Sequence, residues 1–269
     1  MLKLIFKMNR IYYLLLTIIS VIFTSCIPSK DLIYLQNKNK SDAVQAINPI
    51  NNPPYRFQTN DVLSINIKTS DARLGLLFTT SAGQADSNSE QGLYFNGFTV
   101  DDHGNIRMPL LGEIAIIGLT ADEVRQKIEQ KLLSEYFNKE SNLFVTVKLG
   151  GFRYTTNGEI NNTGTKVLFQ EKINILEAIA NSGDIAITGD RKNVQIIRKS
   201  PKGTEIHSLD LTDINIMNSP YYNLQPNDYI YVKPLKQKTW GTGKTGIESL
   251  GTFITILSLA TTTYFLLKK

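Results

Sequence analysis

Few residues in this chain of 269 have the types and spacing that metal binding would need. The two histidines, His103 and His207, lie far apart, and a zinc site needs three or four ligands. Asp101 and Asp102 precede Gly104, but the spaced oxygen ligands and distal glutamate of a calcium-binding EF-hand loop are missing. We therefore expect no metal site and no cofactor site, and we interpret this acidic segment as a turn.

Gly243-Lys244-Thr245 could suggest a phosphate-binding loop. That motif requires a glycine five positions before the second glycine, and Lys238 stands there. It also needs a strand before and a helix after the loop, whereas an apolar segment follows here. We interpret residues 236–246 as a flexible linker that leads into that segment.

Catalytic residues cannot be nominated from this sequence. A Ser-His-Asp arrangement is not recognisable from sequence order alone, and the scattered carboxylates define no pair for glycoside cleavage. We predict that the chain is not an enzyme. A glycan-cleaving enzyme stays open as an alternative, because carboxylate pairs are poorly visible in a sequence.

Cys26, the single cysteine, ends an N-terminal segment with the parts of a secretory signal. Three basic residues precede the apolar run Ile11–Phe23, and Thr24 and Ser25 then lead to the cysteine. The pattern resembles the lipobox of bacterial lipoproteins, which implies cleavage of a signal peptide at residues 1–25 and lipidation of Cys26. The alternatives are a buried free cysteine or a membrane anchor, but a spanning helix needs about 20 apolar residues, more than this run holds.

The charge of the chain changes when this signal is removed. The full sequence has 29 Lys and Arg against 24 Asp and Glu, a net charge of +5. Cleavage removes Lys3, Lys7 and Arg10, and the remaining 244 residues carry a net charge of +2. No basic stripe or recognised motif supports nucleic-acid binding. The mature length suits two modest domains of roughly 100 residues each.

The first predicted domain, residues 55–149, follows a polar segment at 26–54 whose Asn and Pro clusters are typical of a tether. Apolar alternation predicts a strand at Val62–Ile67. Residues 71–97 read as an insertion loop, and a closing strand is expected at Leu143–Val147. Further short strands are expected at Phe98–Val100, Ile106–Leu111 and Glu113–Ile117.

The clearest helix of the sequence begins in this domain. Thr120 and Glu123 form a capping box, in which the first side chain and the third helical residue satisfy each other's backbone donors. Apolar residues then recur at helical spacing, namely Ala121, Val124, Ile128, Leu132 and Tyr136.

The second predicted domain covers residues 150–235. Asn174 and Glu177 form another capping box, and the helix that it begins should end at Gly183. Short strands around this helix indicate a small mixed sheet with a β-grasp-like fold. The predicted strands are Phe152–Tyr154, Lys166–Phe169, Val194–Arg198, Ile206–Leu209 and Tyr229–Val232.

Residues 247–267 form an apolar segment with one charge near its start. A helix of 21 residues spans about 31 Å, which matches a hydrocarbon core. Ser and Thr recur along it, and such residues let membrane helices approach closely. We predict a transmembrane helix, either a lone anchor or one stave of an oligomeric helical barrel. The predicted fold class is α+β: two small mixed α/β domains and a C-terminal transmembrane helix.

Several segments carry a family resemblance. Residues 55–65 resemble the opening of the polysaccharide export domain, with Asn60 where a glycine usually precedes the aspartate. Residues 102–113 resemble its most characteristic segment, and 118–123 lead into its helix. Residues 158–232 are similar to the soluble ligand-binding β-grasp (SLBB) domain, and 30–36 to Bacteroidetes members of the family. The matching motif residues are Asp61, Asp102, Gly104, Pro109, Leu110, Gly112, Gly118, Leu119, Thr120 and Glu123.

This resemblance implies export of capsular polysaccharide or exopolysaccharide across the outer membrane. Members are similar to Wza-type translocons, rings of identical subunits such as octamers, with polysaccharide as substrate. They pair with an inner-membrane polysaccharide co-polymerase, often a tyrosine kinase. The resemblance places a lipid-anchored protein at the outer membrane with its soluble domains in the periplasm. The alternative is a non-conducting, membrane-anchored periplasmic glycan-binding module.

Overall fold

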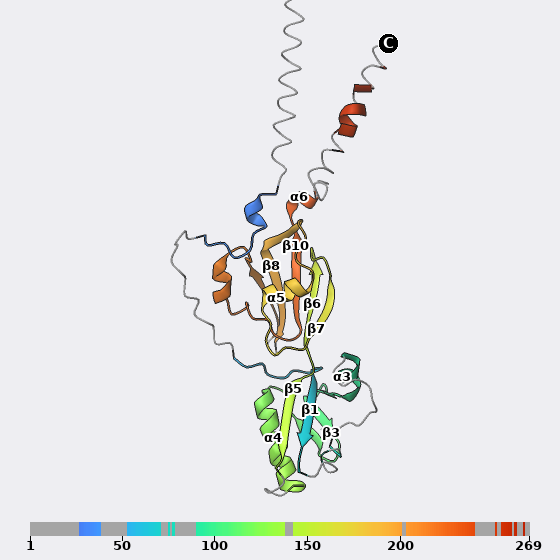
Figure 1. Cartoon of the computed structure of the whole chain (residues 1–269), viewed down its shortest axis with the longest axis vertical. Coiled ribbons are helices and arrows are strands. Elements are labelled where there is room, and N and C mark those ends of the chain that lie inside the picture. Colours follow the sequence, from blue (N-terminus) through green and yellow to red (C-terminus); the bar gives the residue numbers. More distant parts are fainter. Residues whose placement is uncertain are drawn as a thin grey trace, which may run out of the picture.

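Two domains, each with its own apolar core, make up the folded part of the chain (Figure 1). Buried side chains between positions 57 and 147 form the first core, and those between 152 and 232 form the second. This mixed α/β architecture agrees with the predicted fold class at that level. The computed structural model describes residues 27–38, 53–70, 75, 77–78, 90–137, 142–200, 203–239, 251, 254–259, 261–262 and 266.

The first domain is built on an antiparallel sheet of strand order β2-β1-β5. These strands are β1 (Val62–Lys68), β2 (Phe98–Thr99) and β5 (Phe144–Leu149). A separate hairpin pairs β3 (Asn105–Met108) with β4 (Gly112–Ala115). Helix α4 (Ala121–Glu135) packs against β5, and the short helix α3 (Glu90–Asn96) contacts β1.

Local sequence explains the two best-defined elements of this domain. Strand β1 buries alternate side chains, with Leu63, Ile65 and Ile67 turned into the core. Helix α4 buries one stripe at a spacing of four residues, and its predicted capping box is confirmed. Thr120 Oγ1 accepts from the Glu123 backbone N–H at 3.2 Å, and the Glu123 carboxylate accepts from the Thr120 N–H at 2.7 Å.

The second domain is a five-stranded sheet of order β7-β6-β10-β8-β9. Its central neighbours β6 and β10 run parallel, and all other pairs are antiparallel. The second predicted capping box is also confirmed, and Gly183 adopts a left-handed φ of 77° just after the helix. The elements are β6 (Phe152–Gly158), β7 (Gly164–Leu168), α5 (Ile175–Asn181), β8 (Gly189–Ser200), β9 (Gly203–Leu209), η3 (Ile214–Asn218) and β10 (Asp228–Pro234).

The polar N-terminal segment departs from a simple tether. Residues 29–38, here called the N-terminal strap, begin with the 3₁₀ turn η1 (Ser29–Asp31) and dock on the second domain. The Leu35 N–H donates to the Leu211 carbonyl at 3.1 Å, and the Gln36 N–H donates to the Thr212 carbonyl at 2.7 Å. The strap thus precedes the first domain in the sequence but is bound to the second domain.

Side chains strengthen this docking. Lys192 pairs with Asp31 at 2.6 Å. The Tyr34 hydroxyl donates to Asp184, and the Arg191 guanidinium lies 5.3 Å from the centre of the tyrosine ring. Burial, followed by the hydrogen bond to Asp184, raises the pKa of Tyr34 to about 12. The phenol therefore stays protonated and keeps its donor at neutral pH.

Several predicted segments differ in the structure. Residues 90–96, predicted to lie in an insertion loop, form helix α3. The first residues of the predicted linker form the short helix α6 (Lys236–Thr239). The strand predicted at 106–111 ends at Met108, because the left-handed Leu110 and Gly112, at φ 63° and 72°, make a tight connection to the next strand. The strand predicted at 113–117 runs from Gly112 to Ala115.

The two predicted membrane attachments fall largely outside the described residues. The signal peptide at 1–25 and Cys26 are outside them, as is most of 247–267. The positions that are described in the C-terminal segment, 251, 254–259, 261–262 and 266, are helical. Among the described residues, no helix has both the length and the apolar character needed to cross a membrane.

Candidate functional site at the domain junction

Two turns of the same design meet where the domains join. Residues 58–61 read Gln-Thr-Asn-Asp and residues 225–228 read Gln-Pro-Asn-Asp. In each turn the aspartate accepts from the glutamine backbone N–H, at 2.8 Å in the first and 2.7 Å in the second. Each turn then leads directly into a strand, β1 or β10. The repeated sequence therefore builds a repeated backbone structure.

The asparagine of each turn has the same unusual backbone conformation. Asn60 and Asn227 both have a φ of 68°, in the left-handed region. Asparagine is among the few residues other than glycine that enter this region readily. This explains how Asn60 can stand where the family resemblance leads us to expect glycine.

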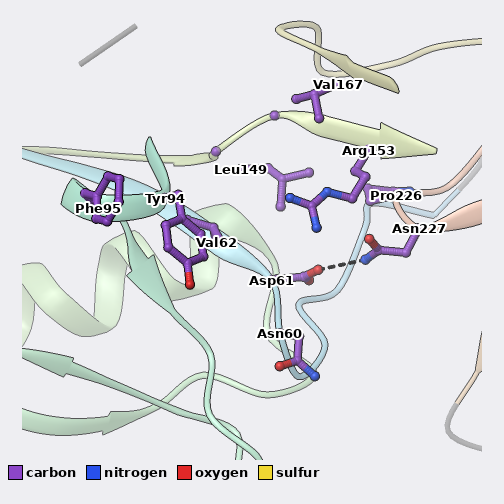
Figure 2. A pocket seen from close by; sticks show the side chains of 12 residues that line it. Asn60, Asp61, Val62, Tyr94, Phe95, Leu149, Arg153, Val167, Pro226 and Asn227 are labelled. Carbon is purple, nitrogen blue, oxygen red and sulfur yellow. Dashed lines mark hydrogen bonds between the residues drawn. The ribbon is translucent and has the colours of Figure 1, made fainter. Parts of the chain in front are cut away.

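The second turn is hydrogen-bonded to the first across the junction. Asn227 Nδ2 donates to Asp61 Oδ1 at 3.0 Å (Figure 2). The other oxygen, Oδ2, accepts from the Tyr55 hydroxyl at 2.7 Å and from the backbone N–H of Gln58 at 2.8 Å. The Asn227 backbone N–H donates to the Arg153 carbonyl at 2.6 Å. One buried carboxylate therefore links the two domains.

Burial changes the acidity of this group. Asp61 is 3% exposed. Desolvation raises its pKa above the ordinary value, although its hydrogen bonds and the nearby Arg153 charge act in the opposite direction. Burial also raises the pKa of Tyr55, and the negative charge of Asp61 adds to that rise. The tyrosine therefore donates a proton to the bond and does not accept one.

Asp228, the matching residue of the second turn, has a different partner. Its carboxylate receives two hydrogen bonds from Arg198, at 2.9 Å from Nε and 2.7 Å from a terminal nitrogen. Both side chains are buried, so the paired geometry compensates for taking two charges out of water. Asp228 thus anchors its turn within the second domain and leaves Asn227 to reach the first.

Two glycines carry the chain from β5 to β6 at the junction. A Cβ added at Gly150 would lie 2.9 Å from the carbonyl oxygen of Val62. Gly151 has a φ of 138°, and a Cβ there would lie 2.5 Å from Val167 Cγ1. The close approach of the two domains requires glycine at both positions.

A pocket of about 470 Å³ opens beside these turns. We call it the junction pocket. Figure 2 shows the Arg153 side chain extending toward the Asp61–Asn227 pair, with the α3 aromatic residues at the other end. Residues from both domains line it, including Asn60, Asp61, Tyr94, Phe95, Arg153 and Asn227.

The other predicted motif residues lie away from this pocket and shape the first domain. The Asp102 side chain is exposed, and it is Asp101 whose carboxylate accepts from the backbone N–H groups of His103 and Asn105, at 2.9 and 2.8 Å. A Cβ at Gly104 would lie 2.4 Å from Ile117 Cβ. These contacts hold the turn before β3, and within the acidic pair it is Asp101 that makes the hydrogen bonds of this turn.

The segment from Pro109 to Glu123 is held from several sides. The Pro109 carbonyl accepts from the Leu111 N–H at 2.7 Å, and the Leu110 carbonyl accepts from the Tyr136 hydroxyl at 3.0 Å. The Gly118 N–H donates to the Phe57 carbonyl and the Phe57 N–H donates to the Leu119 carbonyl, both at 2.9 Å. These motif positions therefore dock the segment before β1 against the entry to α4.

The histidines do not come together. His103 is exposed in the first domain, whereas His207 stacks on Tyr221 in the second with ring centres 3.6 Å apart. Within the described part of the chain, no cluster of three His, Cys, Asp or Glu side chains could hold a metal ion.

A comparison with known protein families matches the first domain of the chain. Residues 49–149 match the family described as "Polysaccharide biosynthesis/export protein". The match covers the first domain and ends before β6 of the second domain. The description of the family names the biosynthesis and export of polysaccharide, and no particular enzymatic reaction.

Two curated relatives come from Ralstonia. The chain is 27% identical over 151 residues to the "EPS I polysaccharide export outer membrane protein EpsA" of Ralstonia solanacearum, across 54% of this chain and 39% of the relative. It is 26% identical over 160 residues to the protein of the same description from Ralstonia nicotianae, across 56% of this chain and 40% of the relative. The matched region spans about two fifths of each relative's length.

Sequence reasoning did not single out the junction pocket. Asp61 belongs to the predicted family motif, but its partners Arg153 and Asn227 do not. The signal that could have found Asn227 is the repeated Gln-x-Asn-Asp pattern before two predicted strands. Tyr94 carries no such signal, since the sequence around it predicts a loop.

Proposed function

We propose that this protein is a lipid-anchored subunit of an oligomeric outer-membrane channel that exports exopolysaccharide. The family match of residues 49–149 carries this proposal. The descriptions of both relatives as polysaccharide export outer membrane proteins support it. The second domain, with its five-stranded mixed sheet and one α-helix, supports assignment to the SLBB type.

The chain enters and leaves the folded region at the same end of the second domain, which supports a particular orientation of the subunit at a membrane. Strand β10 begins at the junction and ends at Pro234, which pairs with Gly189 at the far end of the second domain. Helix α6 follows, and its Lys238 binds Glu159 at 2.5 Å. The strap reaches the same end through the Asp31–Lys192 pair. Figure 1 shows η1 and α6 beside each other there, opposite the first domain.

This arrangement fits a protein that is attached to one membrane by both ends of its folded region. The lipid on Cys26 and the segment at 247–267 would hold the far end of the second domain at the outer membrane. The first domain would then point into the periplasm, about 20 Å further away by the length of β10. In that position it could meet an inner-membrane polysaccharide co-polymerase.

Cys26→Ala tests the lipid anchor. We expect uncleaved precursor and loss of surface polysaccharide, because neither cleavage nor acylation can proceed without the thiol. Fractionated membranes probed for the protein, together with a stain for surface polysaccharide, provide the measurement. Normal surface polysaccharide in cells that carry the variant would contradict an essential lipid anchor.

Deletion of residues 247–269 tests the channel. Both soluble domains have complete cores outside this segment, so we expect them to fold while export stops. Electron microscopy of the detergent-extracted full chain should show rings. Monomers alone would refute the channel and favour the second candidate, a non-conducting glycan-binding module, which the presence of the junction pocket supports.

A further inference from the structure

The junction pocket has an apolar half that is formed by exposed rings. Tyr94 is 69% exposed and Phe95 is 72% exposed, and the two rings meet edge to face with centres 5.2 Å apart. Leu149 and Val167 also line the pocket, on the Arg153 side of the rings (Figure 2). Adjacent exposed rings leave apolar area in water, which a bound ligand would remove. An aromatic face offers a flat apolar surface for the C–H face of a sugar ring.

The polar half of the pocket offers unused hydrogen-bonding capacity. In the described part of the chain, no hydrogen bond or ion pair engages the guanidinium of Arg153, which is exposed and close enough to Asp61 to act on it through its charge. Its five N–H donors suit the hydroxyl or carboxylate oxygens of a ligand. Asn60, which also lines the pocket, adds an exposed amide.

The frame that holds these groups is built before any ligand arrives. Asp61 has its hydrogen bonds made within the protein, so it fixes Asn227 and the two turns and is not itself a free acceptor. The glycine pair at 150–151 sets the distance between the walls. A preformed site loses little conformational entropy on binding.

We propose that the junction pocket binds a short stretch of the exported glycan, with pyranose rings packed on Tyr94 and Phe95 and oxygens bound by Arg153 and Asn60. The volume of about 470 Å³ lies within the usual range for sites that take small molecules. This inference rests on the proposed export function, since it takes the substrate of that function as the ligand. It makes the domain junction a contact point for the polymer.

Calorimetric titration of the full chain in detergent tests the proposal. The probes are short oligosaccharides made by acid hydrolysis of the producing strain's own exopolysaccharide, separated into acidic and neutral fractions. Two variants remove the two halves of the pocket: the double variant Tyr94→Ala/Phe95→Ala, and Arg153→Gln. Phe144→Ala and Arg107→Gln are matched controls, because they change exposed residues of the same types outside the pocket.

We expect the wild-type chain and both controls to bind with equal affinity. The double variant should weaken binding of both fractions. Arg153→Gln should weaken the binding of the acidic fraction by about tenfold or more, which corresponds to the loss of one charge-assisted hydrogen bond. The binding of the neutral fraction should weaken less. Because every altered side chain is exposed, the thermal midpoint should stay within a few degrees of wild type.

Two results would overturn the pocket assignment: wild-type protein that binds neither fraction, or pocket variants that bind as tightly as the controls. Either result leaves the export proposal standing if Cys26→Ala and deletion of 247–269 still abolish export. Conversely, binding that depends on Arg153 while export survives both of those changes would refute the export proposal and retain the pocket as a glycan site.

Discussion

Replacement of Asp61 by alanine should lower the free energy of unfolding of the first domain more than replacement of any exposed residue does. The substitution removes the acceptor of three donors: the Tyr55 hydroxyl, the Gln58 N–H and Asn227 Nδ2. The exposed Asn227 amide can turn to water, but the other two donors lie in a partly buried environment. Each unsatisfied buried donor costs about 1–3 kcal/mol, and the relief of burying a charge offsets part of that cost. We expect a loss of about 3 kcal/mol in the free energy of unfolding.

Hydrogen exchange at the amides of β1 gives a local measurement of this loss. When the equilibrium between the closed and the open state governs exchange, a change of about 3 kcal/mol accelerates it by roughly 150-fold. Asp61→Asn keeps one acceptor oxygen and the side-chain volume, so it should cause a smaller acceleration. Asp102→Ala is the control, because it removes an exposed aspartate of the same domain.

The reasoning fails if Asp61→Ala exchanges at the wild-type rate in β1. It also fails if Asp102→Ala accelerates exchange as strongly as Asp61→Ala does. Exchange in β8 should change less than exchange in β1 in every variant, because β8 belongs to the second core and keeps its own contacts.

The remaining predictions concern pH, a cap and a close contact. Because burial raises the folded-state pKa of Asp61, the folded chain holds this proton at a pH where the unfolded chain has released it. The stability contributed by this group therefore falls as pH rises through the folded pKa. In unfolding titrations run upward from about pH 4, near the ordinary aspartate pKa, Asp61→Asn should show a smaller slope than wild type, and an equal slope would contradict the assignment. Thr120→Ala should reduce the free energy of unfolding by about 1 kcal/mol through loss of the α4 cap, and Thr120→Ser should restore most of it, measured by urea denaturation; an unchanged midpoint in the alanine variant would contradict the cap. Gly158→Ala should lower the thermal midpoint more than Gly164→Ala, since an added Cβ lies 2.0 Å from the Val232 carbonyl oxygen at the first site and meets no atom within 4 Å at the second; equal effects would show that backbone conformation alone decides.

Local sequence signals predicted the elements whose causes are local. The capping boxes at Thr120 and Asn174 marked the starts of α4 and α5, because a cap is made by residues three positions apart. The alternation of Val62–Ile67 marked β1 for the same reason. Helix α3 was missed because its seven residues show no full apolar period and include a glycine.

The features that join distant parts of the chain could not be read in this way. The Asp61–Asn227 bond links residues 166 positions apart, and the Tyr34–Asp184 bond links residues 150 positions apart. No periodicity or spacing reports such a contact. The repeated Gln-x-Asn-Asp turns are the exception, since two copies of one local pattern indicate two similar structures, although not that they touch.

The docking of the N-terminal strap determines how mechanical load would pass through the molecule. A pull on the chain at residue 29 enters the second domain through the Asp31–Lys192 pair and the strap's backbone bonds to residues 211 and 212. A pull at α6 enters the same domain through β10, the central strand of its sheet. Tension between these two points is carried by the second domain alone and does not load the Asp61–Asn227 bond. The Asp61–Asn227 bond therefore lies outside the path that load would take between residue 29 and α6.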